Sequence, residues 1–109
     1  MVAIYDYLHS LNDTPYITAL TGNKLTLGNL LLSIRQGEAM SQVNFAKKLG
    51  LSRQNLCDIE HHRRYVSPKM AAEYAEKLGY SKSQFVRLCL QDLLDRDHLC
   101  MTVEINQAA

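Results

Sequence analysis

The chain has 109 residues, of which 47% are hydrophobic and 21% charged, and its formal net charge is +1. That length supports one compact core but not two ordinary domains. No run approaches the roughly 20 apolar residues of a membrane span, and the first residues lack the pattern of a secretory signal. The cysteines have no paired spacing and indicate reduced thiols; they are Cys57, Cys89 and Cys100. We therefore expect one small cytoplasmic domain without a membrane partner.

Residues 1–25 predict a short helical extension ahead of the main domain. Apolar residues recur at a helical spacing between Ile4 and Leu11. Thr14-Pro15 then has the pattern of an N-cap followed by proline at the first helical position. We expect these two pieces to pack on the domain or on a second copy of it.

Residues 26–97 predict the main domain, and Thr26 has the position of an N-cap for its first helix. The apolar residues that follow recur every three or four positions, as the buried stripe of a helix does. They are Leu27, Leu30, Leu31 and Ile34. Arg35 and Gln36 come next and are expected to face water.

Two short helices joined by a tight turn are predicted between Ser41 and Glu60. Ser41 is a preferred N-cap residue, and Gly50 has the position of the left-handed glycine that ends many helices. Ser52 caps the second helix. The expected buried residues of the pair are Val43, Phe45, Ala46, Leu49, Leu56 and Ile59. Helices that cross steeply need a small side chain near the crossing point, and Ala46 supplies it.

Two further helices complete a predicted five-helix core, and each begins at a serine. Ser67-Pro68 repeats the cap-plus-proline pattern, and Gly79 ends that helix. Ser81 with Gln84 three residues later predicts a capping box, in which each side chain bonds the other residue's backbone N–H. The expected buried residues of these helices are Met70, Ala71, Tyr74, Ala75, Leu78, Phe85, Leu88, Cys89 and Leu93.

The last residues, 98–109, have a different pattern. From Cys100 to Ile105 apolar and polar residues alternate, as they do in a half-buried β-strand. A lone strand cannot satisfy its own backbone groups, so a strand here needs a partner, either a second protomer or another protein. The alternative is a disordered tail.

Basic residues cluster around the two short helices. From Ser41 to Ala72 the net charge is +4, which leaves −3 for the remainder of the chain. The basic residues are Lys47, Lys48, Arg53, Arg63, Arg64 and Lys69, and the acidic ones are Asp58 and Glu60. A basic face on a neutral to acidic body is typical of a phosphate-binding surface, although an ordinary solvated surface can have the same composition.

The second short helix carries polar residues where a base-reading helix needs them. The major groove of B-DNA admits a helix and presents a different donor and acceptor pattern for each base pair. Arg53 can bond a guanine at two points, and Gln54 can do the same for an adenine. Asp58 can accept from cytosine or orient Arg53. The candidates for phosphate contacts, which set affinity and register, are Asn55, His61, Arg63 and Arg64.

This order of residues resembles the helix-turn-helix domain of the Cro/CI (XRE) family of bacterial and phage repressors. The resemblance runs from Leu27 to Leu88 and implies an all-α, five-helix fold that binds DNA. The residues that carry it are Leu30, Ile34-Arg35, Ser41-Gln42, Phe45-Ala46, Leu49-Gly50-Leu51-Ser52, Ile59-Glu60, Ala75 and Leu78-Gly79. Many members have glycine two positions after the glutamate that ends the recognition helix. This chain has His62 there, so the exit from that helix cannot rely on a glycine.

The resemblance also implies roles for single residues. It places four of them at the base-contact surface: Ser52, Arg53, Gln54 and Asp58. It implies that Gln42 holds a phosphate and braces the recognition helix, at a helix start whose free N–H groups favour an anion in any case. It further implies that Glu60 makes a buried or capping interaction with an arginine, for which Arg35 is the expected partner.

Catalysis and metal binding have little support in the sequence. Cys57 and His61 share one helical face, and His62 is adjacent, but a zinc site needs about four ligands and no matching pair occurs elsewhere. There is no glycine-rich phosphate loop and no nucleophile motif. We expect a protein that is not an enzyme and that holds no metal or cofactor.

Together these features predict a sequence-specific transcriptional repressor that binds double-stranded operator DNA. One small domain buries too little DNA to be both tight and specific, so we expect a homodimer that reads two half-sites about one helical turn apart. The Arg63–Pro68 passage and the size of the chain resemble antitoxins that repress their own toxin-antitoxin operon, in which the terminal segments are free to hold a toxin. The alternative is a protein-interaction module that keeps the helical core without using DNA.

Overall fold

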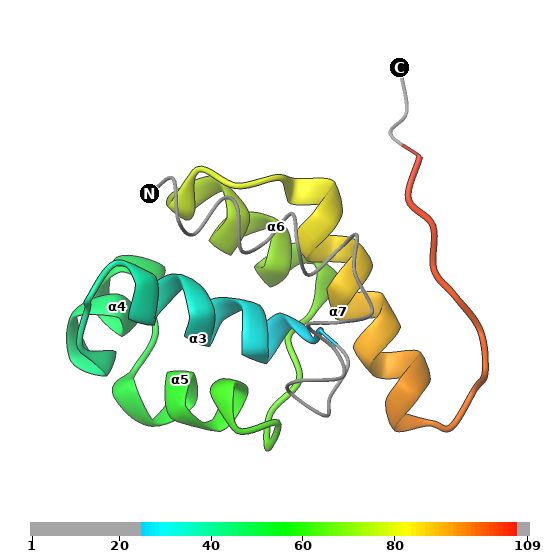
Figure 1. The fold of residues 1–109 in the computed structure, drawn as a ribbon, viewed down its shortest axis with the longest axis horizontal. Coiled ribbons are helices and arrows are strands. Elements are labelled where there is room, and N and C mark those ends of the chain that lie inside the picture. The colour runs from blue at the N-terminus through cyan, green and yellow to red at the C-terminus, as the bar shows by residue number, and fades with distance from the viewer. Residues whose placement is uncertain (1–24, 107–109) are drawn as a thin grey trace.

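The computed structural model describes residues 25–106, and every regular element in that range is an α-helix (Figure 1). The helices are α3 (Leu27–Gly37), α4 (Gln42–Leu49), α5 (Arg53–Glu60), α6 (Pro68–Leu78) and α7 (Lys82–Arg96). The predicted all-α class and the five helices of the main domain are confirmed. The helical extension predicted over residues 1–25 lies outside the described residues, Leu25 excepted.

Hydroxyl side chains start the five helices at the residues that the sequence predicts. In each case the side-chain oxygen accepts a hydrogen bond from the backbone N–H three residues later, one of the donors that a helix start leaves free. The pairs are Thr26 with Asn29 at 3.0 Å, Ser41 with Asn44 at 3.1 Å, Ser52 with Asn55 at 3.0 Å, Ser67 with Met70 at 3.2 Å, and Ser81 with Gln84 at 3.2 Å.

Two glycines end α4 and α6 in the left-handed conformation, as predicted. Gly50 has φ 77° and Gly79 has φ 76°, and the N–H of each bonds back to carbonyls of the last helical turn. The end of α4 has a further donor, because Lys77 Nζ on α6 lies 3.1 Å from the carbonyl oxygen of Leu49. This bond ties the first helix of the helix-turn-helix pair to α6.

The capping box predicted at the start of α7 is only half formed. Ser81 accepts from the Gln84 N–H, but the Ser81 N–H makes no hydrogen bond to the Gln84 side-chain oxygen, and Gln84 Nε2 is buried without a hydrogen-bond partner among the described residues. The Ser81 hydroxyl instead lies 3.1 Å from that of Ser83. The reciprocal bond expected between the Ser81 N–H and the Gln84 side-chain oxygen therefore does not form, and that part of the prediction was wrong.

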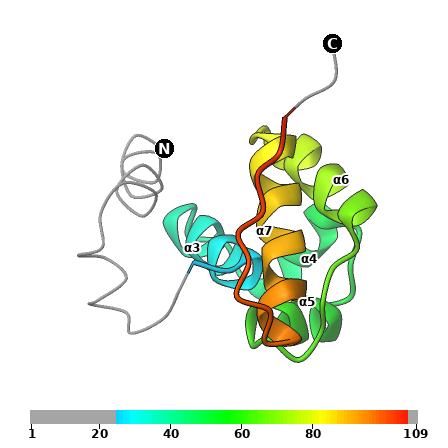
Figure 2. The ribbon, with the colours of Figure 1, turned by 90° about the vertical axis from the view of Figure 1, so that its right-hand side faces the viewer.

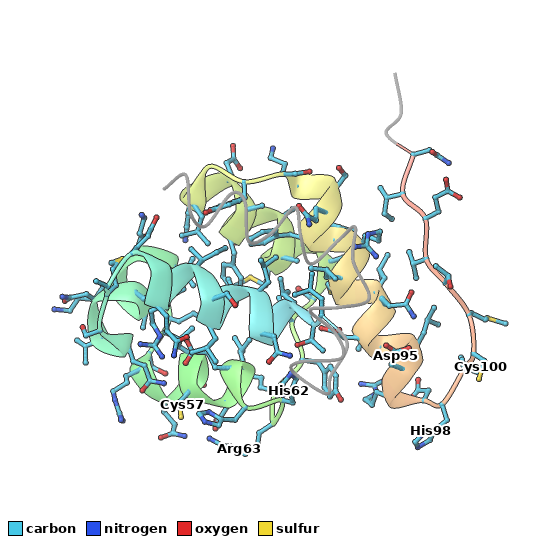
Figure 3. The ribbon with its side chains drawn as sticks, viewed as in Figure 1. Cys57, His62, Arg63, Asp95, His98 and Cys100 are labelled. Atoms are coloured by element: carbon cyan, nitrogen blue, oxygen red, sulfur yellow. The ribbon has the colours of Figure 1, made fainter. Side chains whose placement is uncertain are left out.

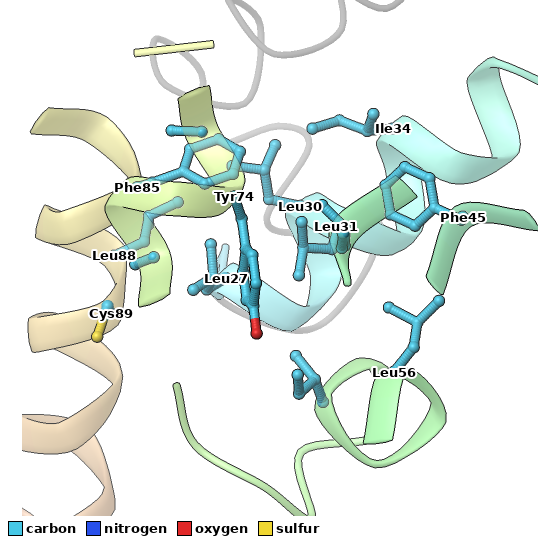
Figure 4. Close-up of a cluster of buried hydrophobic side chains, with 14 of the residues drawn as sticks. Leu27, Leu30, Leu31, Ile34, Phe45, Leu56, Tyr74, Phe85, Leu88 and Cys89 are labelled. Carbon is cyan, nitrogen blue, oxygen red and sulfur yellow. The ribbon is translucent and has the colours of Figure 1, made fainter. Parts of the chain in front are cut away.

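All five helices contribute to one hydrophobic core (Figure 4). Its largest fully buried side chains are Tyr74, Phe45, Phe85, Leu27, Leu30, Leu31, Ile34, Leu49 and Leu56. Ala46 is 1% exposed, which agrees with a close helix crossing at this position. Val43 was wrongly predicted to be buried; it is 45% exposed on the first turn of α4. Three others expected in the core are only partly buried: Met70, Leu78 and Leu93.

A glycine in the first turn of α3 lets that helix lie directly against the end of α5. A methyl group added at Gly28 would collide with the carbonyl oxygen of Ile59, which is backbone and cannot turn away. Gly28 is buried, so no solvent gap exists to accommodate it. The position of α5 relative to α3 therefore depends on the missing side chain at residue 28.

Gly28→Ala is expected to destabilise the fold by about 1–3 kcal/mol, because the added methyl group must push α5 away from α3. An ordinary exposed Gly→Ala change in a helix stabilises by about 1 kcal/mol, so the expected sign is reversed. Chemical denaturation measures the difference, with Ser33→Ala on the same helix as the control. A variant as stable as the parent would show that α3 and α5 do not approach closely at this point.

The start of α3 is held by a carboxylate on α7. The backbone N–H of Leu27 donates to Asp92 Oδ2 at 3.1 Å, which satisfies a donor that the Thr26 cap leaves free. Burial raises the pKa of Asp92 to about 6, the bond from Leu27 opposes that rise, and the charge of Asp95 adds to it. The ordinary aspartate pKa is about 4, so between pH 4 and 6 the native state binds more protons than the unfolded chain. The contribution of Asp92 to the free energy of unfolding therefore falls as pH rises from 4 to 6 and is constant at higher pH.

Asp92→Asn is expected to remove this pH dependence, because asparagine keeps an oxygen acceptor for the Leu27 N–H and does not titrate. The unfolding free energy of the parent, relative to that of the variant, should fall by on the order of 2 kcal/mol from pH 4 to pH 6. Urea unfolding at pH 4, 5, 6 and 7 measures it. Parallel curves for the two proteins would contradict the assigned pKa.

The strand predicted from Cys100 to Ile105 does not form in the single chain, since no residue from 25 to 106 is in a strand. Residues 98–106, the C-terminal tail, instead turn at His98, which has φ 59°, and at Cys100, where Met101 N bonds Leu99 O at 2.8 Å, and then run antiparallel to α7 (Figure 2). The side-chain amide of Gln91 holds them: its Oε1 accepts from Val103 N at 2.9 Å and its Nε2 donates to Met101 O at 2.8 Å. The described part of the chain offers the tail no strand edge, and one side-chain amide takes that place.

Candidate nucleic-acid interface

The two short helices predicted between Ser41 and Glu60 are α4 and α5, and α5 runs along one edge of the molecule beneath α3 (Figure 1). The residues at its start, Ser52, Arg53 and Gln54, are all exposed. Arg53 makes no hydrogen bond or ion pair with any residue from 25 to 106, so its guanidinium group is available to a ligand. Ser52 uses its oxygen to cap the helix and keeps its O–H as a donor. The predicted base-contact residues therefore share one open surface.

Asp58, the fourth predicted base-contact residue, binds two of its neighbours. Its Oδ1 accepts from Gln54 Nε2 at 3.0 Å and from Arg63 Nε at 2.9 Å. The hydrogen bond from Arg63 holds the pKa of the Asp58 carboxyl group below its usual range, and the bond from Gln54 acts in the same direction. Asp58 thus orients Arg63 rather than Arg53, which was the alternative role considered for it.

The predicted phosphate-contact residues line the end of α5 and the loop that follows. Arg64 Nη1 donates to Asn55 Oδ1 at 3.2 Å, and both side chains face outward from this edge. His61 Nδ1 lies 2.8 Å from the carbonyl oxygen of Cys57. A carbonyl oxygen only accepts, so Nδ1 carries the proton, and His61 can donate to a phosphate only when Nε2 is protonated as well. A neutral His61 is therefore not a phosphate donor.

A buried ion pair fixes α5 to α3 and α4. Glu60 has a side chain that is 1% exposed, and it accepts from Arg35 Nε at 2.8 Å and Arg35 Nη2 at 3.2 Å. Gln42 Nε2 donates to the same carboxylate at 2.9 Å, and Arg35 Nη1 also bonds the carbonyl oxygen of Met40 at 3.2 Å. The expected pairing of Glu60 with Arg35 is confirmed. Gln42 braces the recognition helix as expected, whereas its contact with a phosphate stays a prediction.

Glu60→Ala is expected to cost about 3–5 kcal/mol of stability, because it leaves the partly buried guanidinium group of Arg35 and the amide of Gln42 without their acceptor. Glu38→Ala is the matched control: Glu38 pairs with Lys48 at 3.8 Å near the surface, and its loss should cost less than about 1 kcal/mol. Thermal or urea unfolding of both variants measures the difference. Equal losses would mean that the Glu60 cluster does not anchor α5.

His62 occupies the position where many Cro/CI-like chains have glycine, and it adopts the same left-handed conformation, with φ 63°. His62 lies just beyond the end of α5 (Figure 3), and its Nε2 is 2.8 Å from Oγ1 of Thr26, the cap of α3. A strained backbone angle at a non-glycine residue persists only where surrounding contacts hold it. The Thr26 hydroxyl provides such a contact, so the exit from α5 is tied to the start of α3 without a glycine.

The exposed charge of this face is positive. All six basic residues between Ser41 and Ala72 are exposed. Both acidic residues of that segment are already paired with cations, Glu60 with Arg35 in the interior and Asp58 with Arg63 at the surface. The segment that contains α4 and α5 therefore exposes six cations, of which Arg63 pairs with Asp58 at 2.9 Å and Lys48 with Glu38 at 3.8 Å.

Cys57 lies in the middle of this surface and touches two of the predicted contact residues. Its Sγ is 3.6 Å from His61 Nδ1, and Arg63 Nη2 donates to it at 3.4 Å. Among the described residues no three His, Cys, Asp or Glu side chains gather closely enough to hold a metal ion. Cys89 differs, because burial raises the pKa of its thiol to about 11 and the thiol donates to Val66 O at 2.8 Å.

Sequence reasoning missed three residues that position this surface. Gly28 sets the distance between α3 and α5, Asp92 holds the start of α3, and Thr26 binds His62 as well as capping its own helix. Only Thr26 carried a signal, as an N-cap; the other two depend on contacts between helices distant in the sequence.

No protein-family model, curated protein or solved structure matches this chain. Within residues 25–106 no helix is both long enough and apolar enough to cross a membrane. The functional argument therefore rests on the geometry of the α4–α5 surface and on the sequence resemblance.

Proposed function

We propose that the protein is a sequence-specific DNA-binding transcriptional repressor that acts in the cytoplasm as a homodimer. The observation that carries the proposal is the exposed first turn of α5, where Arg53 and Gln54 extend from a helix anchored by the buried Glu60 cluster. A rigid helix with free polar side chains at its N-terminal end is what major-groove reading requires. The exposed cations around it suit the two flanking phosphate backbones.

In this proposal the contacts divide into two kinds. Arg53 and Gln54 read base edges, with Ser52 donating its free hydroxyl proton. Arg63 and Arg64, with Asn55 and Gln42, bind phosphates and set the register of the helix in the groove. Asp58 stays paired with Arg63, and it either releases Gln54 to an adenine or accepts from a cytosine itself.

The resemblance to the Cro/CI family supports this function through Phe45-Ala46, Gly50 and the Arg35–Glu60 pair, each of which has the structural role that the family pattern implies. Within the class we propose an antitoxin that represses its own toxin-antitoxin operon, because the sequence has terminal segments beyond the helix-turn-helix core, as antitoxins that hold a toxin do. Co-expression with the adjacent gene, followed by pull-down and a growth assay, tests this narrower proposal. An adjacent gene that is neither toxic nor a binding partner would remove it.

The competing function is a protein-interaction module that keeps the helical core without binding DNA. The two functions differ in their dependence on salt. A protein that neutralises several phosphates loses affinity steeply as salt rises, with a slope of log K against log salt of roughly −0.9 per phosphate. DNA binding that is absent even at low salt would favour the protein-interaction module.

Arg53→Ala and Gln54→Ala are each expected to lower affinity for the selected operator by about 10- to 100-fold, because each removes a two-point base contact. They should leave binding to random duplexes nearly unchanged. Arg63→Ala and Arg64→Ala should weaken operator and random DNA alike and reduce the salt slope by about 1 each. Selection from a random duplex library supplies the operator, and fluorescence anisotropy at several salt concentrations measures the affinities.

Lys82→Ala is the control for these variants, since Lys82 is an exposed cation at the start of α7 that pairs with Glu76 at 3.7 Å. It should leave both affinities unchanged. Equal losses on operator and random DNA for all four α5-region variants would contradict the division into base and phosphate contacts.

A further inference from the structure

The C-terminal tail exposes apolar side chains that the helical domain does not cover. Among the described residues, four large hydrophobic side chains are exposed, and two of them belong to the tail: Leu99 at 45% and Met101 at 62%. Between the tail and α7 lies an open hollow of about 730 Å³. Arg87, Gln91 and Asp95 of α7 line it together with the first residues of the tail. This surface is separate from α5 and has no part in the proposed DNA contacts.

The hydrogen bonds from Gln91 determine which edge of the tail is free. In an extended segment the backbone groups of alternate residues point to opposite edges. Gln91 bonds Met101 O and Val103 N, so the odd-numbered residues direct their backbone groups toward α7. The N–H and C=O groups of Thr102 and Glu104 point the other way, and they have no hydrogen-bond partner among residues 25–106. The tail is therefore already paired along one edge and open along the other.

We propose that residues 101–105 pair with the same residues of a second copy of this chain, as an antiparallel β-ribbon whose two-fold axis passes between the two Val103 residues. The proposal gives a structural form to the homodimer in the proposed function and rests on that part of it. Thr102 of each copy then exchanges both backbone hydrogen bonds with the partner's Glu104. Val103 faces the partner's Val103 as a pair without hydrogen bonds between them.

This register is complementary in side chains as well as in backbone. Met101, Val103 and Ile105 lie on one face of the ribbon, where Met101 is opposite the partner's Ile105. The carboxylate of Glu104 is opposite the partner's Thr102 hydroxyl rather than a second carboxylate, so no like charges meet. A shift by one residue would place the backbone groups that Gln91 already binds against the partner, so the Gln91 contact selects the edge that pairs. A shift that placed Glu104 opposite the partner's Glu104 would keep that edge but bring two carboxylates together.

The α7 surface beside the ribbon is also suited to a second copy. A two-stranded ribbon alone is marginally stable in water and needs an apolar surface to pack against. The hollow between α7 and the tail supplies apolar side chains beside the ribbon in each copy, among them Leu88 of α7 and Leu99 of the tail.

Disulfide trapping tests the register. In a Cys57→Ser, Cys100→Ser background, Val103→Cys should form an intermolecular disulfide on mild oxidation, because facing residues without hydrogen bonds between them have Cα atoms about 4.5 Å apart. Thr102→Cys is the matched control: its diagonal partner lies about 7–8 Å away, too far for a disulfide without backbone movement. Non-reducing electrophoresis measures both. Cross-linking at residue 102 equal to or above that at residue 103 overturns the proposal.

A proline at the free edge tests the pairing itself. Thr102→Pro removes the N–H that donates to the partner's Glu104 and leaves both Gln91 bonds intact, whereas Thr102→Ala keeps the N–H. Sedimentation equilibrium should show a dimer dissociation constant raised about tenfold or more by proline and little changed by alanine. Circular dichroism checks that the helical domain of each variant remains folded. A parent chain that is monomeric, or a proline variant that dimerises as the parent does, overturns the proposal.

The failure of this proposal and of the DNA-binding function can be distinguished. DNA binding by a parent protein whose Val103→Cys variant does not cross-link leaves the repressor function in place and removes the ribbon. A cross-linked dimer that binds no duplex at low salt leaves the ribbon in place and removes the repressor function.

Discussion

The buried carboxylate of Glu60 is the interaction on which the arrangement of the α3, α4 and α5 helices depends. It lies at the end of α5 and accepts three hydrogen bonds, two from Arg35 on α3 and one from Gln42 on α4. A buried charge is tolerated only when such partners compensate for its lost hydration. All three helices must therefore keep their relative positions for the carboxylate to remain buried. An apolar contact would allow small displacements at less cost, so the ion pair gives α5 a defined direction as well as an anchor.

Near the start of α5 the side chains make weaker, solvent-exposed hydrogen bonds, and this difference bears on the proposed DNA contacts. Asp58 binds Gln54 and Arg63 at the surface, where water competes for each hydrogen bond and an ion pair contributes little stability. The helix axis is thus fixed by buried groups, while the side chains that would read DNA can exchange partners at low cost. Among residues 25–106 the Arg53 side chain has no hydrogen-bond partner to give up, which makes it the least costly of these groups to recruit.

The sequence predicted those features that depend on near neighbours. Serine caps, the left-handed glycines at Gly50 and Gly79 and the helix periodicity are local signals, and the structure confirms them. The Arg35–Glu60 pair was predicted only through the resemblance to a family. Gly28 and Asp92 gave no sequence signal, because their roles come from contacts with helices far away in the chain. Val43 was wrongly predicted to be buried. It is an apolar residue at an exposed position in the first turn of α4, and residue spacing alone cannot distinguish such a position from a buried one.

The same distant contacts connect the tail to the recognition helix. Gln91 and Asp92 are consecutive on α7: the first binds the tail, and the second binds the start of α3. From there Gly28 sets the distance from α3 to α5 at Ile59. Each step is a direct hydrogen bond or a close backbone approach, so the orientation of the tail and that of α5 are related through one series of contacts. A dimer formed through the tails would therefore also fix the angle and separation of its two recognition helices, which is the geometric condition for reading two half-sites at a set spacing.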